Sequence, residues 1–272
     1  MDKYDYTDPV CPSCTEQYRK EPPARRVPLD RILQKLDEHL AKDDSEGGKK
    51  MLLYWLKEAR LGGDERGELS ILNELMGLCR NMGLEKEAFL YADAGVSLAE
   101  KTDLSDSVTG ATVFLNAATV CKAFGKTDEA FDLYRKTREI YEKYLGPCDY
   151  RLGSLYNNMG LALFAKKDYA AALVLYEKAL EIMKILPDCE GEQAVTHLNI
   201  ADLLYATEGA EESEKAVSFR LDEAEKALDG ATLRNGKYAF ICTKCAPVFG
   251  FYGRFLFEAE LKKRAKDIYE RN

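Results

Sequence analysis

The stretch YNNMGLALFAKKDYAAALVLYEKAL (156–180) decides the fold, because its pattern of small and aromatic residues returns along the chain every 42 residues. The pattern consists of a small residue on a first helix, a turn, and then a small residue and an aromatic residue on a second helix. A fixed period of this length indicates one helical unit that is copied and stacked, so that each copy buries the apolar face of its neighbour. The equivalent positions are Met76, Ala118 and Gly160; Gly83, Gly125 and Lys167; Ala88, Ala130 and Ala172; Ala92, Tyr134 and Tyr176.

These copies resemble the tetratricopeptide repeat, because Tyr156, Gly160, Ala172, Tyr176 and Ala179 fall on the signature spacing of that family. The usual repeat has about 34 residues, and the longer period is similar to that of kinesin light chains. About eight extra residues allow each helix roughly one more turn. The resemblance implies an all-α, right-handed superhelical solenoid whose concave groove, lined by the first helix of each pair, binds peptides or proteins.

Proline and glycine positions divide the chain into four parts. Five of the eight prolines lie within the first 28 residues, so this segment is predicted to be an extended arm. Near the other end, Pro247, Gly250 and Gly253 are expected to interrupt a helix, because proline removes a backbone donor. We predict twelve helices in about six antiparallel pairs, divided into an arm (1–27), a leading hairpin (28–63), four repeats (64–229) and irregular C-terminal capping helices (230–272).

Helix boundaries follow from the same signals. In the leading hairpin, helices are predicted over 28–42 and 48–61, with the sequence DDSEGG between them. The second helices of the four repeats are predicted to start near Glu85, Thr127, Asp168 and Ala210.

The composition argues against several classes of partner. The net charge is −8 and the isoelectric point is near 5.1, whereas nucleic-acid and anionic-membrane surfaces attract clustered Lys and Arg. No apolar run approaches the ~18 residues that a membrane span needs. The N-terminal sequence MDKYDYTDPV lacks a signal-peptide core. Together with eight cysteines, this favours a reducing compartment and predicts a cytoplasmic protein without nucleic-acid or membrane partners.

Few residues suggest catalysis. The chain has two histidines, and His197 occupies the repeat position of Phe114 and Tyr156, which predicts that it is buried. His39 lies in the leading hairpin with no cysteine or carboxylate at catalytic spacing. We find no Ser, His and Asp in the chain order of a serine hydrolase, no phosphate-binding glycine loop and no metalloprotease helix motif in the sequence. We therefore expect a protein that is not an enzyme.

The cysteines fall into three groups. Cys79 and Cys121 occupy the position of Leu163 in the next repeat and are predicted to be core residues, while Cys148 and Cys189 lie in loops between repeats. Two C-x-x-C pairs remain, in CPSC and CTKC, and four thiolates suffice for a tetrahedral zinc site. Because 227 residues separate the two pairs, we favour the interpretation that each pair is reduced and independent, and we expect no cofactor. The alternative is a structural zinc ion shared by Cys11, Cys14, Cys242 and Cys245.

The predicted groove carries the most informative side chains. Counted from the small residue as position 8, positions 5, 9 and 12 of each first helix face the groove. Position 12 reads Arg80, Lys122, Phe164 and Tyr205 along the array, two cations followed by two aromatic residues. Asparagine recurs at positions 5 and 6, and its amide both donates and accepts hydrogen bonds. We predict that these side chains bind a peptide backbone, the alternative being that they tie neighbouring helices together; they are Asn73, Asn116, Asn157, Asn158 and Asn199.

The sequence therefore predicts a non-catalytic interaction module, an adaptor or scaffold, that binds an extended peptide segment of a partner protein. Two alternatives stay open: a regulator that senses a short free peptide, and a zinc- or redox-responsive protein that uses the two C-x-x-C pairs.

Overall fold

The chain folds into a stack of helical pairs in a computed structural model that describes residues 25–42, 44–102 and 104–270. Its described residues contain helices and no strands, which confirms the predicted all-α solenoid. The helices are α2 (Leu29–Leu40), α3 (Ser45–Gly62), α4 (Glu65–Asn81), α5 (Glu85–Lys101), α6 (Val108–Ala123), α7 (Thr127–Tyr144), α8 (Tyr150–Ala165), α9 (Tyr169–Ile185), α10 (Glu190–Glu208), α11 (Ala210–Gly230), α12 (Gly236–Phe251) and α13 (Phe255–Glu270).

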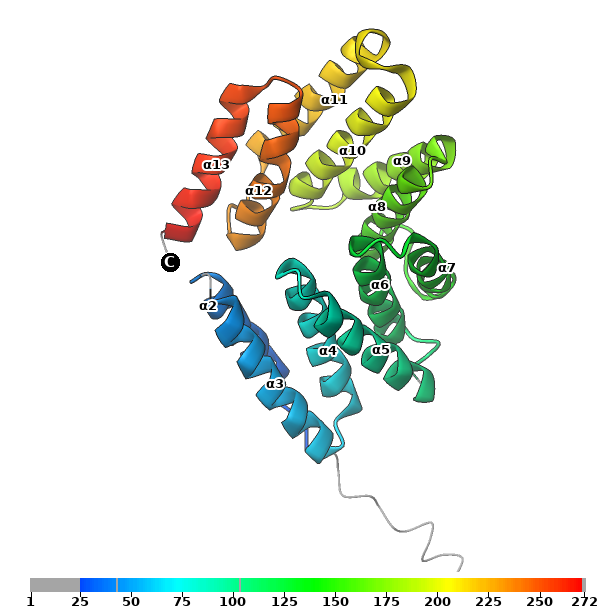
Figure 1. The fold of residues 1–272 in the computed structure, drawn as a ribbon, viewed down its shortest axis with the longest axis vertical. Coiled ribbons are helices and arrows are strands. Elements are labelled where there is room, and N and C mark those ends of the chain that lie inside the picture. Colours follow the sequence, from blue (N-terminus) through cyan, green and yellow to red (C-terminus); the bar gives the residue numbers. More distant parts are fainter. Residues whose placement is uncertain (1–24, 43, 103, 271–272) are drawn as a thin grey trace, which may run out of the picture.

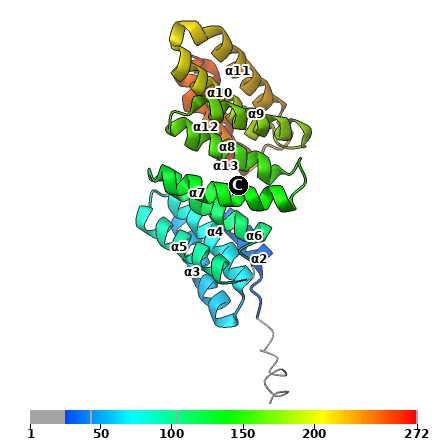
Figure 2. The ribbon, with the colours of Figure 1, turned by 90° about the vertical axis from the view of Figure 1, so that its right-hand side faces the viewer.

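The pairs follow one another in an open arc that carries the last pair round toward the first (Figure 1). Seen from the side, the first pairs lie together in the lower part and α8 to α11 in the upper part, where α12 and α13 lie at the same height because the arc turns back (Figure 2). The first helices α4, α6, α8, α10 and α12 pack directly on one another, whereas the second helices make no comparable contact with each other within the described chain. The row of touching helices must lie on the inside of the curve, so these first helices line the concave face.

Short turns close the pairs in a conformation that favours glycine. Gly83, Gly125 and Gly209 have φ values of 71°, 83° and 86°, and Lys167 occupies the same place with φ 63°. A side chain in this left-handed region places its Cβ too close to the backbone. The positive φ therefore recurs at this turn even in the repeat where lysine takes the place of glycine.

In the central pairs, a small residue on the first helix packs against an aromatic ring on the second helix. A Cβ atom added to Gly160 would lie 2.5 Å from Cε1 of Tyr176, closer than atoms approach in proteins. Tyr176 and its counterpart Tyr134 are fully buried. Cys79 and Cys121 are buried in the core as predicted. The core continues from pair to pair along the array instead of collecting at one centre.

The leading hairpin differs from the prediction at one boundary. Helix α3 begins at Ser45, not at residue 48, because the carboxylate of Asp44 accepts a hydrogen bond from the backbone N–H of Gly47 at 2.9 Å and caps the helix. Asp44 also accepts from Nδ1 of His39 at 2.8 Å. His39 thus contacts a carboxylate that its sequence spacing did not indicate, because the turn between α2 and α3 folds Asp44 back over the end of α2.

The C-terminal pair is more regular than predicted. Helix α12 runs without interruption through Pro247, which lies in its last turns. Cys245, Ala246 and Phe249 surround the proline in sequence and are buried, so packing compensates for the single lost hydrogen bond. Gly253, with φ 78°, lies in the turn to α13. Proline therefore does not break this helix, and the glycine marks its end.

The left-handed turn generates the first prediction. Replacing Lys167 by glycine should raise the free energy of unfolding by about 0.5–1 kcal/mol, because the relief of backbone strain, ~1–2 kcal/mol, exceeds the entropy that glycine adds to the unfolded chain. Gly125→Ala at the equivalent turn should lower it by a similar amount. Chemical denaturation followed by circular dichroism measures both. A Lys167→Gly variant no more stable than the parent would contradict the assigned backbone conformation.

The concave groove as candidate functional site

The predicted groove residues lie on the concave row of helices. Arg80, Lys122, Phe164 and Tyr205 come from α4, α6, α8 and α10, four successive first helices. Tyr205 is 39% exposed, and the other three are half-buried. They form a row across the array, one residue per repeat.

The two cations lie close together and lack anionic partners. Lys122 has no carboxylate within ion-pairing distance in the described chain, and Arg80 donates only to Oδ1 of its neighbour Asn81, at 3.3 Å. Burial and, to a smaller extent, the positive charge of Arg80 together lower the pKa of Lys122 to about 8. Burial also lowers the pKa of Arg80. The groove therefore concentrates positive charge that the protein itself does not neutralise, although the chain has a net charge of −8.

The two aromatic residues of the row are each supported by further rings. Phe164 packs against Tyr169 of α9 with the ring centroids 5.5 Å apart. Tyr205 contacts Phe251 and Tyr252, which lie at the C-terminal end of α12, at 5.5 Å and 5.8 Å. The aromatic half of the row is therefore wider than the sequence indicated, because the last pair contributes to it.

The asparagines divide between two roles. Nδ2 of Asn199 donates to Oδ1 of Asn157 at 2.9 Å, and Oγ1 of Thr196 donates to the same oxygen at 3.1 Å, so these side chains tie α8 to α10. Asn158 donates to the carbonyl of Ser154 in its own helix at 3.0 Å. For Asn157 and Asn199 the geometry favours the alternative that these side chains tie neighbouring helices together, whereas Asn158 bonds only within α8.

Two further asparagines keep hydrogen-bonding capacity. Oδ1 of Asn73 is buried without a hydrogen-bond partner among the described residues. Asn116 is half-buried on α6, the helix that also carries Lys122. Beside Asn73, Glu74 is also half-buried, and its burial, together with the negative charge of Asp37, raises its carboxyl pKa. The polar groups that remain available for a backbone are therefore on the first two repeats.

Candidate catalytic and metal residues do not gather in the groove. His197 is buried as predicted, and burial, aided by the positive charges of Arg220 and Lys184, lowers its pKa to about 4. Cys242 and Cys245 are buried in α12, and burial raises both thiol pKa values, that of Cys245 to about 12. Cys11 and Cys14 lie outside the described residues, so the shared zinc site stays a prediction. Within the described ranges, no three His, Cys, Asp or Glu side chains are arranged to hold a metal ion.

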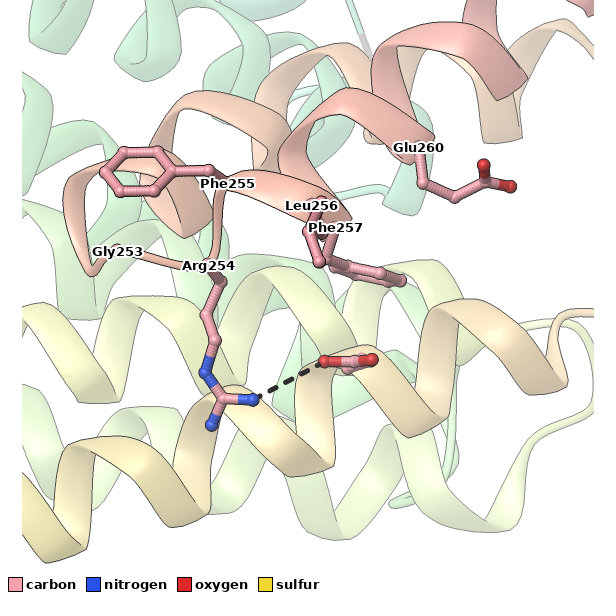
Figure 3. Close-up of a pocket in the computed structure, with 7 residues that line it drawn as sticks. Gly253, Arg254, Phe255, Leu256, Phe257 and Glu260 are labelled. Carbon is pink, nitrogen blue, oxygen red and sulfur yellow. Dashed lines mark ion pairs between the residues drawn. The ribbon is translucent and has the colours of Figure 1, made fainter.

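One hollow of the described chain lies outside the row of first helices. It has a volume of about 460 Å³ and lies between α11 and the start of α13, where Phe255 and Leu256 are exposed (Figure 3). Its charged groups are already paired: Arg254 with Asp222 at 2.7 Å and with Glu225 at 3.9 Å, and Glu260 with Arg264 at 3.0 Å. The hollow therefore lacks the uncompensated polar groups that distinguish the concave row.

Comparisons with known proteins agree with this architecture. Models of the tetratricopeptide repeat match residues 111–147 and 151–217. The structure resembles that of BtubC (BKLC) from P. vanneervenii, with a TM-score of 0.64 and 22% identity over 74% of this chain and 81% of that one. It also resembles a putative kinesin light chain with nearly identical TPR-like repeats from Podosopora anserina, with a TM-score of 0.54 and 16% identity over 76% and 97% of the two chains.

A sequence relative has a different length. The Clustered mitochondria protein homolog of Lodderomyces elongisporus is 24% identical over 216 residues, 77% of this chain, and the chain spans only 16% of that protein. The helical pairs, the repeat matches and the structural neighbours together define a repeat protein of the all-α solenoid class. Residues 111–147 and 151–217 of the chain match the tetratricopeptide repeat, and the fold of the array is similar to that of the putative kinesin light chain.

Repeats of this family generally mediate the binding of protein partners, and their fold is typically non-catalytic. None of the described helices has both the length and the apolar character that crossing a membrane requires.

The buried cation generates a pH-dependent prediction. The folded-state pKa of Lys122, about 8, lies below the ordinary lysine value of 10.5. Below pH 8 the lysine is protonated in both the folded and the unfolded state, and the folded protein bears the full cost of burying the charge. Between pH 8 and 10.5 the unfolded state binds more protons than the folded state. The cost of burial therefore disappears as the pH rises. Lys122→Met should therefore be more stable than the parent at pH 7, and the difference should shrink by pH 10.

Urea denaturation at several pH values measures that difference. Lys86→Met, which removes an exposed lysine from α5, is the matched control and should show no such trend. A stability difference for Lys122→Met that stays constant from pH 7 to pH 10 would contradict the burial of its ammonium group.

Proposed function

We propose that this protein is a non-catalytic adaptor whose concave groove binds an extended peptide segment of a partner protein. The observation that carries the proposal is the pair Arg80 and Lys122, two neighbouring half-buried cations without an anionic partner in the described chain. Holding two like charges together at partial burial is unfavourable unless a ligand of opposite charge is bound. An acidic side chain or a terminal carboxylate of the partner supplies that charge.

The rest of the row provides a second kind of contact. Phe164 and Tyr205 present rings on the next two repeats, which suit an apolar or aromatic side chain of the same segment. Asn73 and Asn116 lie beside the cationic end with unused hydrogen-bonding groups, and amides of this kind bind a peptide backbone independently of its sequence. Because first helices pack ~8–10 Å apart and an extended peptide advances ~3.3 Å per residue, each repeat spans about three residues.

A peptide library tests the proposal. Immobilised wild-type protein should enrich peptides that carry an acidic residue, or a free C-terminus in a non-amidated arm of the library. Arg80→Glu/Lys122→Glu should lose this preference and bind the selected peptides at least tenfold more weakly at low salt, an effect that salt reduces by screening. Lys86→Glu/Lys101→Glu changes the net charge equally on the outer helix α5 and should bind as the wild type does.

The aromatic contact should respond differently to salt. Phe164→Ala should weaken binding of the selected peptides to the same extent at low and high salt, because burial of an aromatic side chain is not screened. Titration by fluorescence anisotropy at two salt concentrations measures both effects. If the wild type and the double charge reversal enrich the same motifs, the cationic row is not the binding surface and the proposal fails.

A further inference from the structure

Asp202 is a groove residue that the repeat pattern did not single out. It lies on α10 three residues before Tyr205, at position 9, where the preceding repeats carry Gly77, Thr119 and Leu161. Its carboxylate is half-buried and accepts a hydrogen bond from the hydroxyl of Tyr252 at 2.8 Å. Burial raises its carboxyl pKa. No cationic side chain of the described chain lies within ion-pairing distance, so this end of the groove has an uncompensated negative charge.

Tyr252, which donates to Asp202, belongs to a cluster of three aromatic rings. Tyr205, Phe251 and Tyr252 pack edge to face, with centroid separations of 5.5, 5.8 and 4.9 Å. Phe251 is 65% exposed and Tyr205 is 39% exposed, so their faces remain accessible beside the carboxylate. Ring faces attract an ammonium or guanidinium group, and more strongly where the site is partly desolvated.

A buried hydroxyl nearby lacks a partner. The side chain of Tyr176 on α9 is fully buried, and its Oη makes no hydrogen bond in the described chain. In the preceding repeat the equivalent Tyr134 donates to Thr119 at 3.5 Å, but Leu161 replaces that threonine here and cannot accept. Tyr176 is close enough to Asp202 that burial and the carboxylate charge both raise its pKa. The hydroxyl of Tyr176 therefore lies near the Asp202 carboxylate without compensating its charge.

We propose that Asp202, together with the rings of Tyr205 and Phe251, binds a lysine or arginine side chain of the same extended segment whose acidic residue lies on Arg80 and Lys122. This inference rests on the proposed groove function and refines its ligand: the apolar or aromatic side chain lies on Phe164, and Tyr205 contacts the basic one. A cationic side chain compensates the half-buried carboxylate, whereas an apolar side chain would bury that charge without a partner. The groove thus has a positive end at Arg80 and Lys122 and a negative end at Asp202. Its ligand carries an acidic residue at the first end and a basic residue at the second.

The distance between the two ends sets the spacing in the ligand. Lys122 is on α6 and Asp202 is on α10, two first helices further along the row. At ~8–10 Å per helix and ~3.3 Å per extended residue, about five or six residues separate the acidic from the basic position. A segment with adjacent opposite charges does not reach both ends.

A library of N-acetylated, C-amidated peptides tests the inference, because blocked ends leave only side-chain charges. The wild type should enrich a basic residue about five or six positions from an acidic one. Asp202→Asn should keep the acidic preference and lose the basic one. Asp93→Asn, which removes an exposed carboxylate from α5, is the matched control and should select the wild-type motif.

A single selected peptide gives the quantitative test. Replacing its basic residue by norleucine should weaken binding to the wild type about tenfold and leave binding to Asp202→Asn unchanged. If the basic preference persists in Asp202→Asn, or if no basic residue is selected, this inference is overturned while the proposed groove function stands. If the wild type enriches no motif from either blocked or free-ended peptides, both are overturned.

Discussion

The close approach of two helices, permitted by a small residue facing an aromatic ring, is the constraint on which the rest of the structure depends. At Gly160 the ring of Tyr176 occupies the space that a Cβ atom would need. The ring then fills the space toward the next pair and is itself fully buried. Because the same contact recurs along the chain, the pairs stack with a constant offset, and the first helices form one row. The groove is a consequence of this offset.

Much of the fold followed from the sequence because the repeat encodes contacts between neighbours. The starts of α5, α7, α9 and α11 lie within one residue of their predicted positions, since small residues, turns and aromatic residues all recur with the same period. The continuation of α12 through Pro247 was not predictable, because burial of the neighbouring residues compensates for the hydrogen bond that a proline removes from a helix. The capping of α3 by Asp44 was missed because the two glycines that follow it suggested a longer loop.

The site was predictable only in part, for a related reason. Position 12 of the repeat indicated Arg80, Lys122, Phe164 and Tyr205, and all four lie on first helices of the concave row. The repeat period predicts contacts between equivalent positions, but it does not predict which non-equivalent side chains bond to each other. The hydrogen bond between Tyr252 and Asp202 joins residues 50 apart in sequence, and the link from Asn199 to Asn157 connects positions 5 and 6 of adjacent repeats. An acidic residue at position 9 of the last repeat was the available signal for Asp202.

The way the last pair is attached has a mechanical consequence. Helix α12 packs on α10, and side-chain contacts such as the one between Tyr238 and the carbonyl of Leu228 hold the pair to α11. In the preceding repeats, each second helix packs along the next first helix. The last joint is therefore held by α10 and by side-chain contacts to α11, not by a second helix that lies along the next first helix. The Asp202–Tyr252 hydrogen bond bridges that joint, so a group that binds Asp202 acts directly on a contact that holds the terminal pair in place.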